Sequence, residues 1–255
     1  MSMVWKLSYF LGFQIKKKKE GIFISQDKYA KNIVKKFGLD KSPHKRAPVV
    51  THFKITKDSK AESVDNKLYK NMIGSLLYSI ASRLDIAYAV GVCARFQYDP
   101  RVSHLAVFKE LTNMFMVLVS FGILYSYDTN STLVGYYDAD WVNCSEDRKN
   151  TSRGCFFLGN NLISWFSKKK NCVSLSTTEA EYIVVGSGCT QRIWMKQMLY
   201  EYGIQQDTMT IYCDNMSAIY ISKNPVQQNR TKHIDIRHHF IRKLIEENII
   251  SLEHV

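Results

Sequence analysis

Short apolar runs separated by turn signals dominate the second half of the chain. The runs at 133–141, 154–159 and 162–166 are rich in apolar, aromatic and β-branched residues, which predicts three strands. The pair Asn160-Asn161 joins the last two runs. Because Asn tolerates positive φ, this pair favours a tight hairpin and therefore antiparallel pairing.

Helical spacing of apolar residues over 177–202 predicts a long helix. It would begin at a capping box, in which Ser176 caps the first turn and Glu179 reaches back to the Ser176 N–H. Gly186 and Gly188 fall inside this helix, where each costs roughly 1 kcal/mol relative to Ala. Close approach to the sheet is the usual compensation, so we expect tight packing there.

Four further elements complete this half. Asn215 is the expected N-cap of the first of two shorter helices. The order of three antiparallel strands, a crossover helix, a parallel strand, more helix and a last strand predicts an α/β fold around a mixed five-stranded sheet. The four elements are a strand at 208–213, helices at 216–223 and about 233–247, and a strand at 249–255.

The first half combines a hairpin with helical patterns. Apolar runs at 10–15 and 21–25 flank a run of lysines, which predicts a hairpin with a charged turn. A helical pattern over 26–37 follows, and then the polar, Lys-rich stretch 43–65, which we interpret as a linker. Three more helical patterns predict a helical layer with Tyr69, Ile73, Leu76, Leu77 and Ile80 in its core; they cover 68–82, 85–96 and 103–119.

Charge is concentrated in the first quarter of the chain. The net charge is +12, and residues 1–60 hold 15 Lys/Arg against 4 Asp/Glu. An excess of this kind is typical of a surface that faces phosphates, or of a solvated basic face. A length of 255 residues and a hydrophobic content of 45% allow one large or two ordinary packed domains.

Cysteine usage and hydropathy bear on the compartment. The six cysteines show no C-x-x-C spacing, which predicts reduced thiols in a cytoplasmic or nuclear protein. The apolar run 7–13 is short and precedes Lys16, so it does not resemble a secretory signal. The run 114–125 is too short to span a bilayer, so we expect no membrane association.

Three carboxylates are the candidate chemistry. Asp138 and Asp214 lie near the ends of two predicted strands, and Glu181 lies on the long helix. Glu181 follows Glu179 by two positions, about 200° round the helix, so it is free to face the strands. Each acid alone would more often be a strand-end or cap residue. Converging together, the three would suit Mg²⁺ or Mn²⁺, which prefer oxygen ligands.

Several motifs occur in the order found in a known family. They resemble the ribonuclease H domain of copia-type LTR retrotransposon polyproteins, and two further motifs upstream resemble the end of the reverse transcriptase of the same elements. The resemblance covers nearly the whole chain. The motifs are Tyr-Tyr-Asp-Ala-Asp-Trp at 136–141, 162–169, Ser-Thr-Thr-Glu-Ala-Glu-Tyr at 176–182, Tyr-Cys-Asp-Asn at 212–215, 222–226 and 230–237, and upstream 7–12 and 72–78.

The resemblance implies a fold and a domain order. The fold would be α/β, with a ribonuclease H-like mixed five-stranded sheet preceded by a mainly helical reverse-transcriptase thumb or connection region. We expect a palm-end hairpin, helix and basic linker at 1–60, the helical region at 61–130, and a ribonuclease H-like domain, truncated at its C-terminus, at 131–255.

The resemblance also implies a function. Asp138, Glu181 and Asp214 would be the catalytic and metal-binding residues of a two-metal hydrolysis of the RNA strand of RNA–DNA hybrids. The expected partners are such a hybrid or another nucleic acid, and the remainder of the Pol polyprotein. Lys168, Lys169 and Lys170 are candidates for phosphate contacts. Phe10, Leu11 and Gly12 resemble a primer-gripping hairpin.

The sequence departs from the family in ways that predict weak activity. The polymerase motif Tyr-x-Asp-Asp is absent. The chain ends at Val255, before the fourth acid of such sites, and Asp235 fits a cap better than a ligand. The family's Thr-Ser-Gly turn reads Thr-Ser-Arg-Gly at 151–154, and its basic helix end is apolar at 114–119.

The alternative function is therefore that of a non-catalytic nucleic-acid-binding remnant or host-adopted protein. An unrelated metal phosphoesterase is disfavoured, because His-rich ligand spacing is absent.

Overall fold

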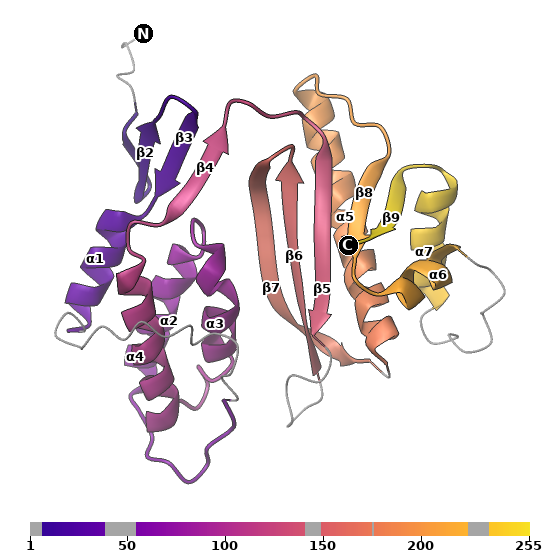
Figure 1. Cartoon of the computed structure of the whole chain (residues 1–255). Helices are drawn as coiled ribbons and strands as arrows, with labels where there is room; N and C mark the ends of the chain where they lie inside the picture. The colour runs from indigo at the N-terminus through magenta and orange to yellow at the C-terminus, as the bar shows by residue number, and fades with distance from the viewer. Residues whose placement is uncertain (1–6, 39–54, 141–148, 175, 224–234) are drawn as a thin grey trace. The chain divides into compact units, whose positions relative to one another are not determined.

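The protein consists of two units, Met1–Asp128 and Thr129–Val255, in the computed structural model. The structure describes residues 7–38, 55–140, 149–174, 176–223 and 235–255 (Figure 1).

A four-stranded antiparallel sheet opens the first unit, in the order β1-β2-β3-β4. The predicted hairpin with a charged turn is β2 and β3, which pair from Gln14 with Ser25 to Lys17 with Ile22. The sequence did not indicate β4, which pairs with β3 although almost a hundred residues separate them. The strands are β1 (Tyr9–Phe10), β2 (Phe13–Lys17), β3 (Gly21–Ser25) and β4 (Gly122–Ser126).

Four helices build the core of this unit. Tyr69, Ile73 and Leu76 are fully buried, as their helical spacing predicts. Leu77 was wrongly predicted as core: its side chain is 40% exposed, because it lies one position beyond the buried stripe. The helices are α1 (Asp27–Lys36), α2 (Asn66–Ser79), α3 (Leu84–Ala94) and α4 (Val102–Val117).

A mixed five-stranded sheet of order β7-β6-β5-β8-β9 forms the second unit, which confirms the predicted ribonuclease H-like architecture. β5, β6 and β7 pair antiparallel, whereas β8 runs parallel to both β5 and β9. β6 and β7 are longer than predicted, and β7 includes the three lysines 168–170. The strands are β5 (Leu133–Asp140), β6 (Lys149–Leu158), β7 (Asn161–Val173), β8 (Met209–Cys213) and β9 (Ile250–His254).

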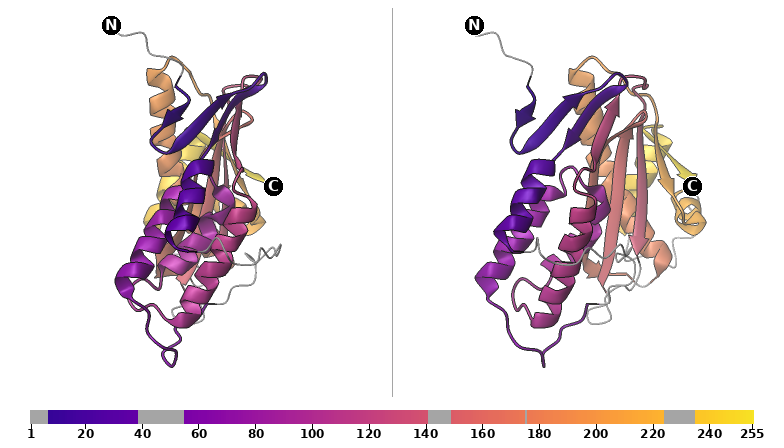
Figure 2. Two further views of the ribbon diagram at one scale, coloured as in Figure 1. Left: turned by 90° about the vertical axis from the view of Figure 1, so that its left-hand side faces the viewer. Right: turned by 60° about the vertical axis from the view of Figure 1, so that its left-hand side comes forward.

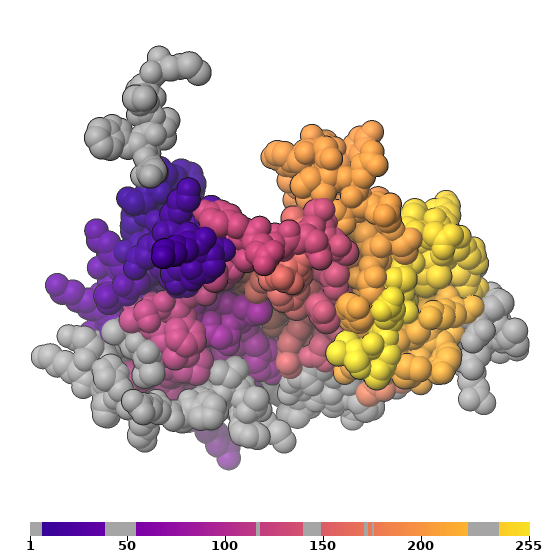
Figure 3. All heavy atoms as spheres, turned by 45° about the horizontal axis from the view of Figure 1, so that its top comes forward, coloured from indigo at the N-terminus to yellow at the C-terminus, as the bar shows by residue number. Residues whose placement is uncertain are grey.

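Three helices pack against this sheet, namely α5 (Thr177–Glu201), α6 (Met216–Lys223) and α7 (Asp235–Glu246). The long helix α5 runs beside the sheet, and its contacts reach β5, β6 and β8 (Figures 1 and 2). The C-terminal residues, drawn yellow, lie against the orange residues of β8 and α6 (Figure 3). No described helix is both long and apolar enough to cross a membrane.

Local sequence explains where α5 begins and how closely it packs. Ser176 Oγ accepts a hydrogen bond from the Glu179 N–H at 3.1 Å, the first half of the predicted capping box. A Cβ on Gly188 would lie only 2.0 Å from Cζ of the buried Tyr137 on β5. The absence of a side chain at Gly188 therefore lets α5 approach β5. Gly186 instead faces Ile241 of α7, 3.4 Å from its would-be Cβ.

Candidate metal centre

Glu181 is the buried centre of the candidate site. It lies in the second turn of α5 and is 3% exposed. Its Oε1 accepts a hydrogen bond from the Ala139 N–H of β5 at 2.6 Å, and its Oε2 lies 3.8 Å from Sγ of Cys213. The pKa of Glu181 is raised to about 7, chiefly by burial and also by the charges of Asp214 and Asp138, which together outweigh the lowering effect of the Ala139 hydrogen bond.

Asp214 approaches the same point from the end of β8. It directly follows Cys213, the last residue of the strand, and its side chain is exposed. The next residue, Asn215, caps α6 as predicted, with Oδ1 accepting from the Ala218 N–H at 3.1 Å. Ligand atoms of Glu181, Cys213 and Asp214 all lie within 4.8 Å of one another. Two of the three predicted acids therefore meet.

Asp138 lies beside this group and is not part of it. Its side chain is 50% exposed, and Oδ2 lies 3.4 Å from Nη1 of Arg153. The two residues face each other in the β5–β6 register. Because Ala139 is bonded to Glu181, Asp138 is close enough for its charge to raise the pKa of Glu181.

Sequence reasoning missed two residues of this site. Cys213 is completely buried, and its pKa is raised to about 12, mainly by burial. Its position immediately before Asp214 is a signal that it ends the same strand. Arg153 is opposite Asp138 only because of the strand register, which the sequence did not supply.

The candidate nucleic-acid residues fall in both units. On β7, Lys168 is exposed and Lys170 donates from Nζ to Oγ of Ser187 at 2.8 Å. In the first unit, Phe10 ends β1, and Leu11 and Gly12 form the turn to β2, both with positive φ. Phe10 and Leu11 are more than half exposed, and the Tyr78 hydroxyl donates to the Leu11 carbonyl. The side chain of Asp235 lies outside the described residues.

The donor set fits a divalent cation. Burial is the main cause of the raised pKa of Glu181, and the nearby charges of Asp214 and Asp138 add to it. A bound cation would stabilise the ionised Glu181 carboxylate and offset the repulsion among these carboxylates. Their oxygen atoms suit Mg²⁺ or Mn²⁺, whereas the Cys213 thiol is a softer ligand and Arg153 repels cations.

Comparison with known proteins gives the family. The chain is 34% identical over 238 residues to the retrovirus-related Pol polyprotein from transposon TNT 1-94 of Nicotiana tabacum, which covers 91% of the chain. It is 33% identical over 251 residues, 98% of its length, to the corresponding polyprotein from transposon RE1 of Arabidopsis thaliana. The chain belongs to the copia-type retrotransposon Pol polyproteins.

This Pol segment spans less than a fifth of those relatives, 18% of the first and 17% of the second. No family model matches it. Its fold is similar to a foamy viral protease-reverse transcriptase solved in complex with dsDNA, with a TM-score of 0.54 and 13% identity. That likeness covers 97% of the Pol segment and 44% of the viral chain.

Proposed function

We propose that this Pol segment binds Mg²⁺ or Mn²⁺ through Asp138, Glu181 and Asp214, and that the site serves hydrolysis of the RNA strand of RNA–DNA hybrids. The observation that carries the proposal is the approach of Glu181 and Asp214 to within 4.8 Å of each other, with Asp138 adjacent. A pair of bound divalent ions would activate the attacking water and stabilise the leaving oxygen.

The residues of the chain would divide the work by their burial. Glu181 is held in place by the Ala139 N–H, so its second oxygen can face a cation without a change of rotamer. Asp214 is exposed and can meet an approaching substrate. Asp138 must first exchange its contact with Arg153 for a contact with the cation.

The same geometry supports weak catalysis. Arg153 places a positive charge beside Asp138, where it competes with a metal ion. This ion pair favours a second candidate, a non-catalytic protein that still binds nucleic acid. In that case Lys168, Lys169 and Lys170, with Phe10, Leu11 and Gly12, would contact the nucleic acid while the acids stay without function.

The experiment combines metal titration with a cleavage assay. Calorimetric titration with Mn²⁺ should show binding that Glu181→Gln and Asp214→Asn each weaken at least about tenfold, as expected for loss of a charged ligand. A labelled RNA–DNA hybrid should be cleaved slowly in Mn²⁺, and Asp138→Asn should remove this cleavage.

Two outcomes would count against the proposal. If neither substitution changed the Mn²⁺ affinity, Glu181 and Asp214 would not be ligands of the ion. Hybrid binding without any cleavage, with metal binding intact, would favour the non-catalytic candidate. That second outcome would also support the alternative of a host-adopted protein.

A further inference from the structure

The turn between β1 and β2 has an unusual backbone for its sequence. Leu11 and Gly12 form this turn, with φ of 45° and 80°. Hairpin turns with positive φ at both positions favour Asn-Gly or Asp-Gly, because in the left-handed region a larger side chain brings Cβ close to a carbonyl oxygen. Burial does not offset this cost, since Phe10 and Leu11 are 53% and 68% exposed. Another contact must therefore hold the turn.

Tyr78, in the last turn of α2, contacts both residues of the Leu11-Gly12 turn. Its hydroxyl donates to the Leu11 carbonyl oxygen, across 67 residues of sequence. A Cβ on Gly12 would lie 3.3 Å from both Cε1 and the hydroxyl oxygen of Tyr78. Gly12 therefore serves two purposes, because it permits positive φ and leaves room for the tyrosine ring.

The ring of Tyr78 is itself fixed by the elements beside it. Tyr29 of α1 meets it edge to face, with 4.9 Å between the ring centroids. Phe13, the first residue of β2, packs against it at 6.3 Å. The buried Gln26 donates from Nε2 to the Tyr78 carbonyl at 3.2 Å. Because these contacts hold the residue from several directions, the hydroxyl has a defined position.

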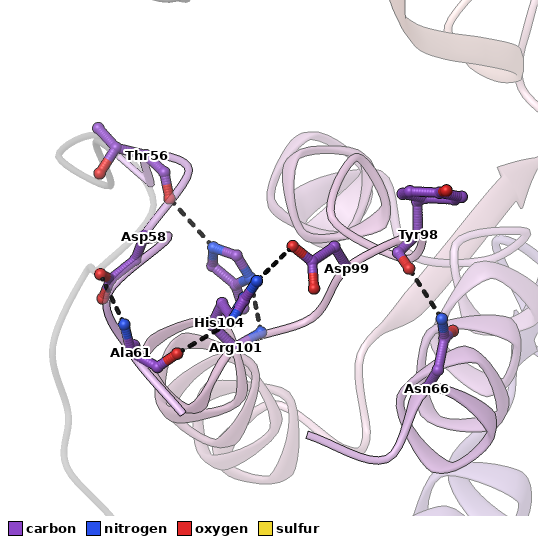
Figure 4. A network of polar contacts seen from close by, with 8 residues as sticks. All are labelled: Thr56, Asp58, Ala61, Asn66, Tyr98, Asp99, Arg101 and His104. Atoms are coloured by element: carbon purple, nitrogen blue, oxygen red, sulfur yellow. Dashed lines mark hydrogen bonds and ion pairs between the residues drawn. The ribbon is translucent and has the colours of Figure 1, made fainter. Parts of the chain in front are cut away.

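The other end of α2 is anchored by a network of polar contacts (Figure 4). Asn66, the first residue of the helix, donates from Nδ2 to the Tyr98 carbonyl at 2.8 Å. Just before the helix, the Ala61 N–H donates to Asp58 at 3.2 Å, and the Ala61 carbonyl accepts from Nη1 of Arg101 at 3.1 Å. The buried face of α2 packs into the helical core between these ends. The core therefore sets the position of Tyr78, and Tyr78 sets that of the turn.

The surroundings of the turn suit a nucleic acid. Nζ of Lys28, on α1, lies 5.7 Å from the centroid of the Tyr9 ring on the strand that leads into the turn. The exposed lysines 16–19 lie toward the other end of β2. An exposed aromatic ring such as Phe10 can stack on a base, while neighbouring lysines contact phosphates.

We infer that Tyr78 is the positioning residue of the Leu11-Gly12 turn, and that its hydroxyl holds Phe10 and Leu11 ready for contact with nucleic acid. The inference rests on the proposed contact of Phe10, Leu11 and Gly12 with nucleic acid. A turn that already has its bound conformation loses less conformational entropy on binding, so the hydroxyl raises affinity without touching the ligand. Without it, the left-handed conformation of Leu11 loses its compensating hydrogen bond and the turn relaxes.

Binding of a labelled RNA–DNA hybrid to the whole chain in EDTA, followed by fluorescence anisotropy, tests the inference without metal or cleavage. Tyr78→Phe keeps the ring and removes only the hydroxyl. It should weaken binding by about three- to tenfold, as expected for loss of one hydrogen bond. Tyr98→Phe is the matched control, because Tyr98 belongs to the same unit and is 90% exposed. It should bind as the unsubstituted chain does.

A second variant separates a positioning role from a direct contact. Phe10→Ala and Leu11→Ala together, called the tip variant, remove both exposed apolar side chains and should weaken binding. If Tyr78 acts through the turn, Tyr78→Phe added to the tip variant should change the affinity by less than about twofold, because no apolar side chain remains to be positioned.

Amide hydrogen exchange gives a readout in the absence of nucleic acid. The Ile15 N–H donates to the Ser8 carbonyl at 2.9 Å in this hairpin. Its protection should fall by about three- to tenfold in Tyr78→Phe. The Lys18 N–H, which donates to the Gly21 carbonyl beyond the far end of β2, should keep its protection and shows that the sheet remains folded.

The inference would be overturned if Tyr78→Phe bound the hybrid as tightly as the unsubstituted chain, or if it lost the same affinity with and without the tip. Unchanged Ile15 protection in Tyr78→Phe would also overturn it. These results would leave the proposed function standing. If instead the tip variant bound as tightly as the unsubstituted chain, the proposed contact of the turn with nucleic acid would fail, and the positioning role with it.

Discussion

The Ala139 N–H donates to Oε1 of Glu181 at 2.6 Å, across 42 residues of sequence. This bond fixes the start of α5 against β5, at the residue directly after Asp138. The bond also explains why the acid two positions after the capping-box Glu179 is the one that turns toward the strands. A carboxylate in this position is buried, accepts a backbone hydrogen bond and is close to two other acids.

Glu181 should make the metal-free protein less stable as pH rises. Its pKa rises from 4.5 in the unfolded chain to about 7 in the folded chain, so folding favours its protonated form. The resulting stabilisation is complete below about pH 4.5 and is lost as pH rises to about 7, a difference on the order of 3 kcal/mol. Urea unfolding in EDTA over this range should show the fall in the unsubstituted chain and not in Glu181→Gln. Parallel curves for the two proteins would contradict it.

Arg153 should weaken the metal site, and its removal should strengthen it. Arg153→Ala takes away the positive charge 3.4 Å from Asp138. Because both side chains are partly exposed, solvent screens the effect, and we expect Mn²⁺ affinity to rise by about three- to tenfold at low salt and less at high salt. Calorimetric titration measures this. Lys168→Ala removes the same charge from the neighbouring strand; an equal gain in both variants would indicate a general field effect.

Elements with strong end signals could be predicted from the sequence. The helix predicted at 177–202 is α5 at Thr177–Glu201, and the helix predicted at 216–223 is α6 at Met216–Lys223. In both cases a side chain, Ser176 or Asn215, accepts a backbone hydrogen bond at the first turn. Local chemistry sets these boundaries, so a local pattern can find them.

Elements that depend on distant partners could not be predicted from the sequence. β4 lies at the end of a continuous apolar stretch that begins in α4, and only pairing with β3 makes it a strand. β7 extends through 168–170 because β6 pairs with it, although three lysines resemble a loop. In the site, the three acids were candidates from their motifs, whereas the contact of Arg153 with Asp138 follows from strand register alone.

The two glycines of α5 should respond oppositely to alanine. A Cβ at Gly188 would meet the buried Tyr137 ring at 2.0 Å, so Gly188→Ala should lower the free energy of unfolding by about 2 to 3 kcal/mol through overpacking. At Gly186 the nearest atom is Ile241 Cδ1 at 3.4 Å, an ordinary contact. Gly186→Ala should therefore be neutral or stabilise by up to about 1 kcal/mol through helix propensity. Urea unfolding measures the free energy of unfolding of both variants. Equal destabilisation of the two would refute the proposed packing of α5 against β5.

Arg192 is one of the largest fully buried side chains. We expect its buried charge to lower the free energy of unfolding. Its guanidinium donates to the carbonyls of Leu133 and Thr210, while its Nε has no hydrogen-bond partner. Among the described residues no carboxylate pairs with it, and burial lowers its pKa to about 10. The side chain thus carries a charge into the core beneath β5 and β8 without an opposite charge to balance it.

Replacement of Arg192 by an apolar side chain of similar length should therefore stabilise the fold. Arg192→Met would leave two carbonyls without this donor, at about 1 kcal/mol each, but would remove the desolvation penalty of a buried ion, which is several kcal/mol. We expect the free energy of unfolding to rise by about 1 to 2 kcal/mol. Arg192→Ala should instead lower it, since a cavity remains. If urea unfolding showed Arg192→Met to be less stable than the unsubstituted chain, the two carbonyl contacts would outweigh the cost of burying the charge.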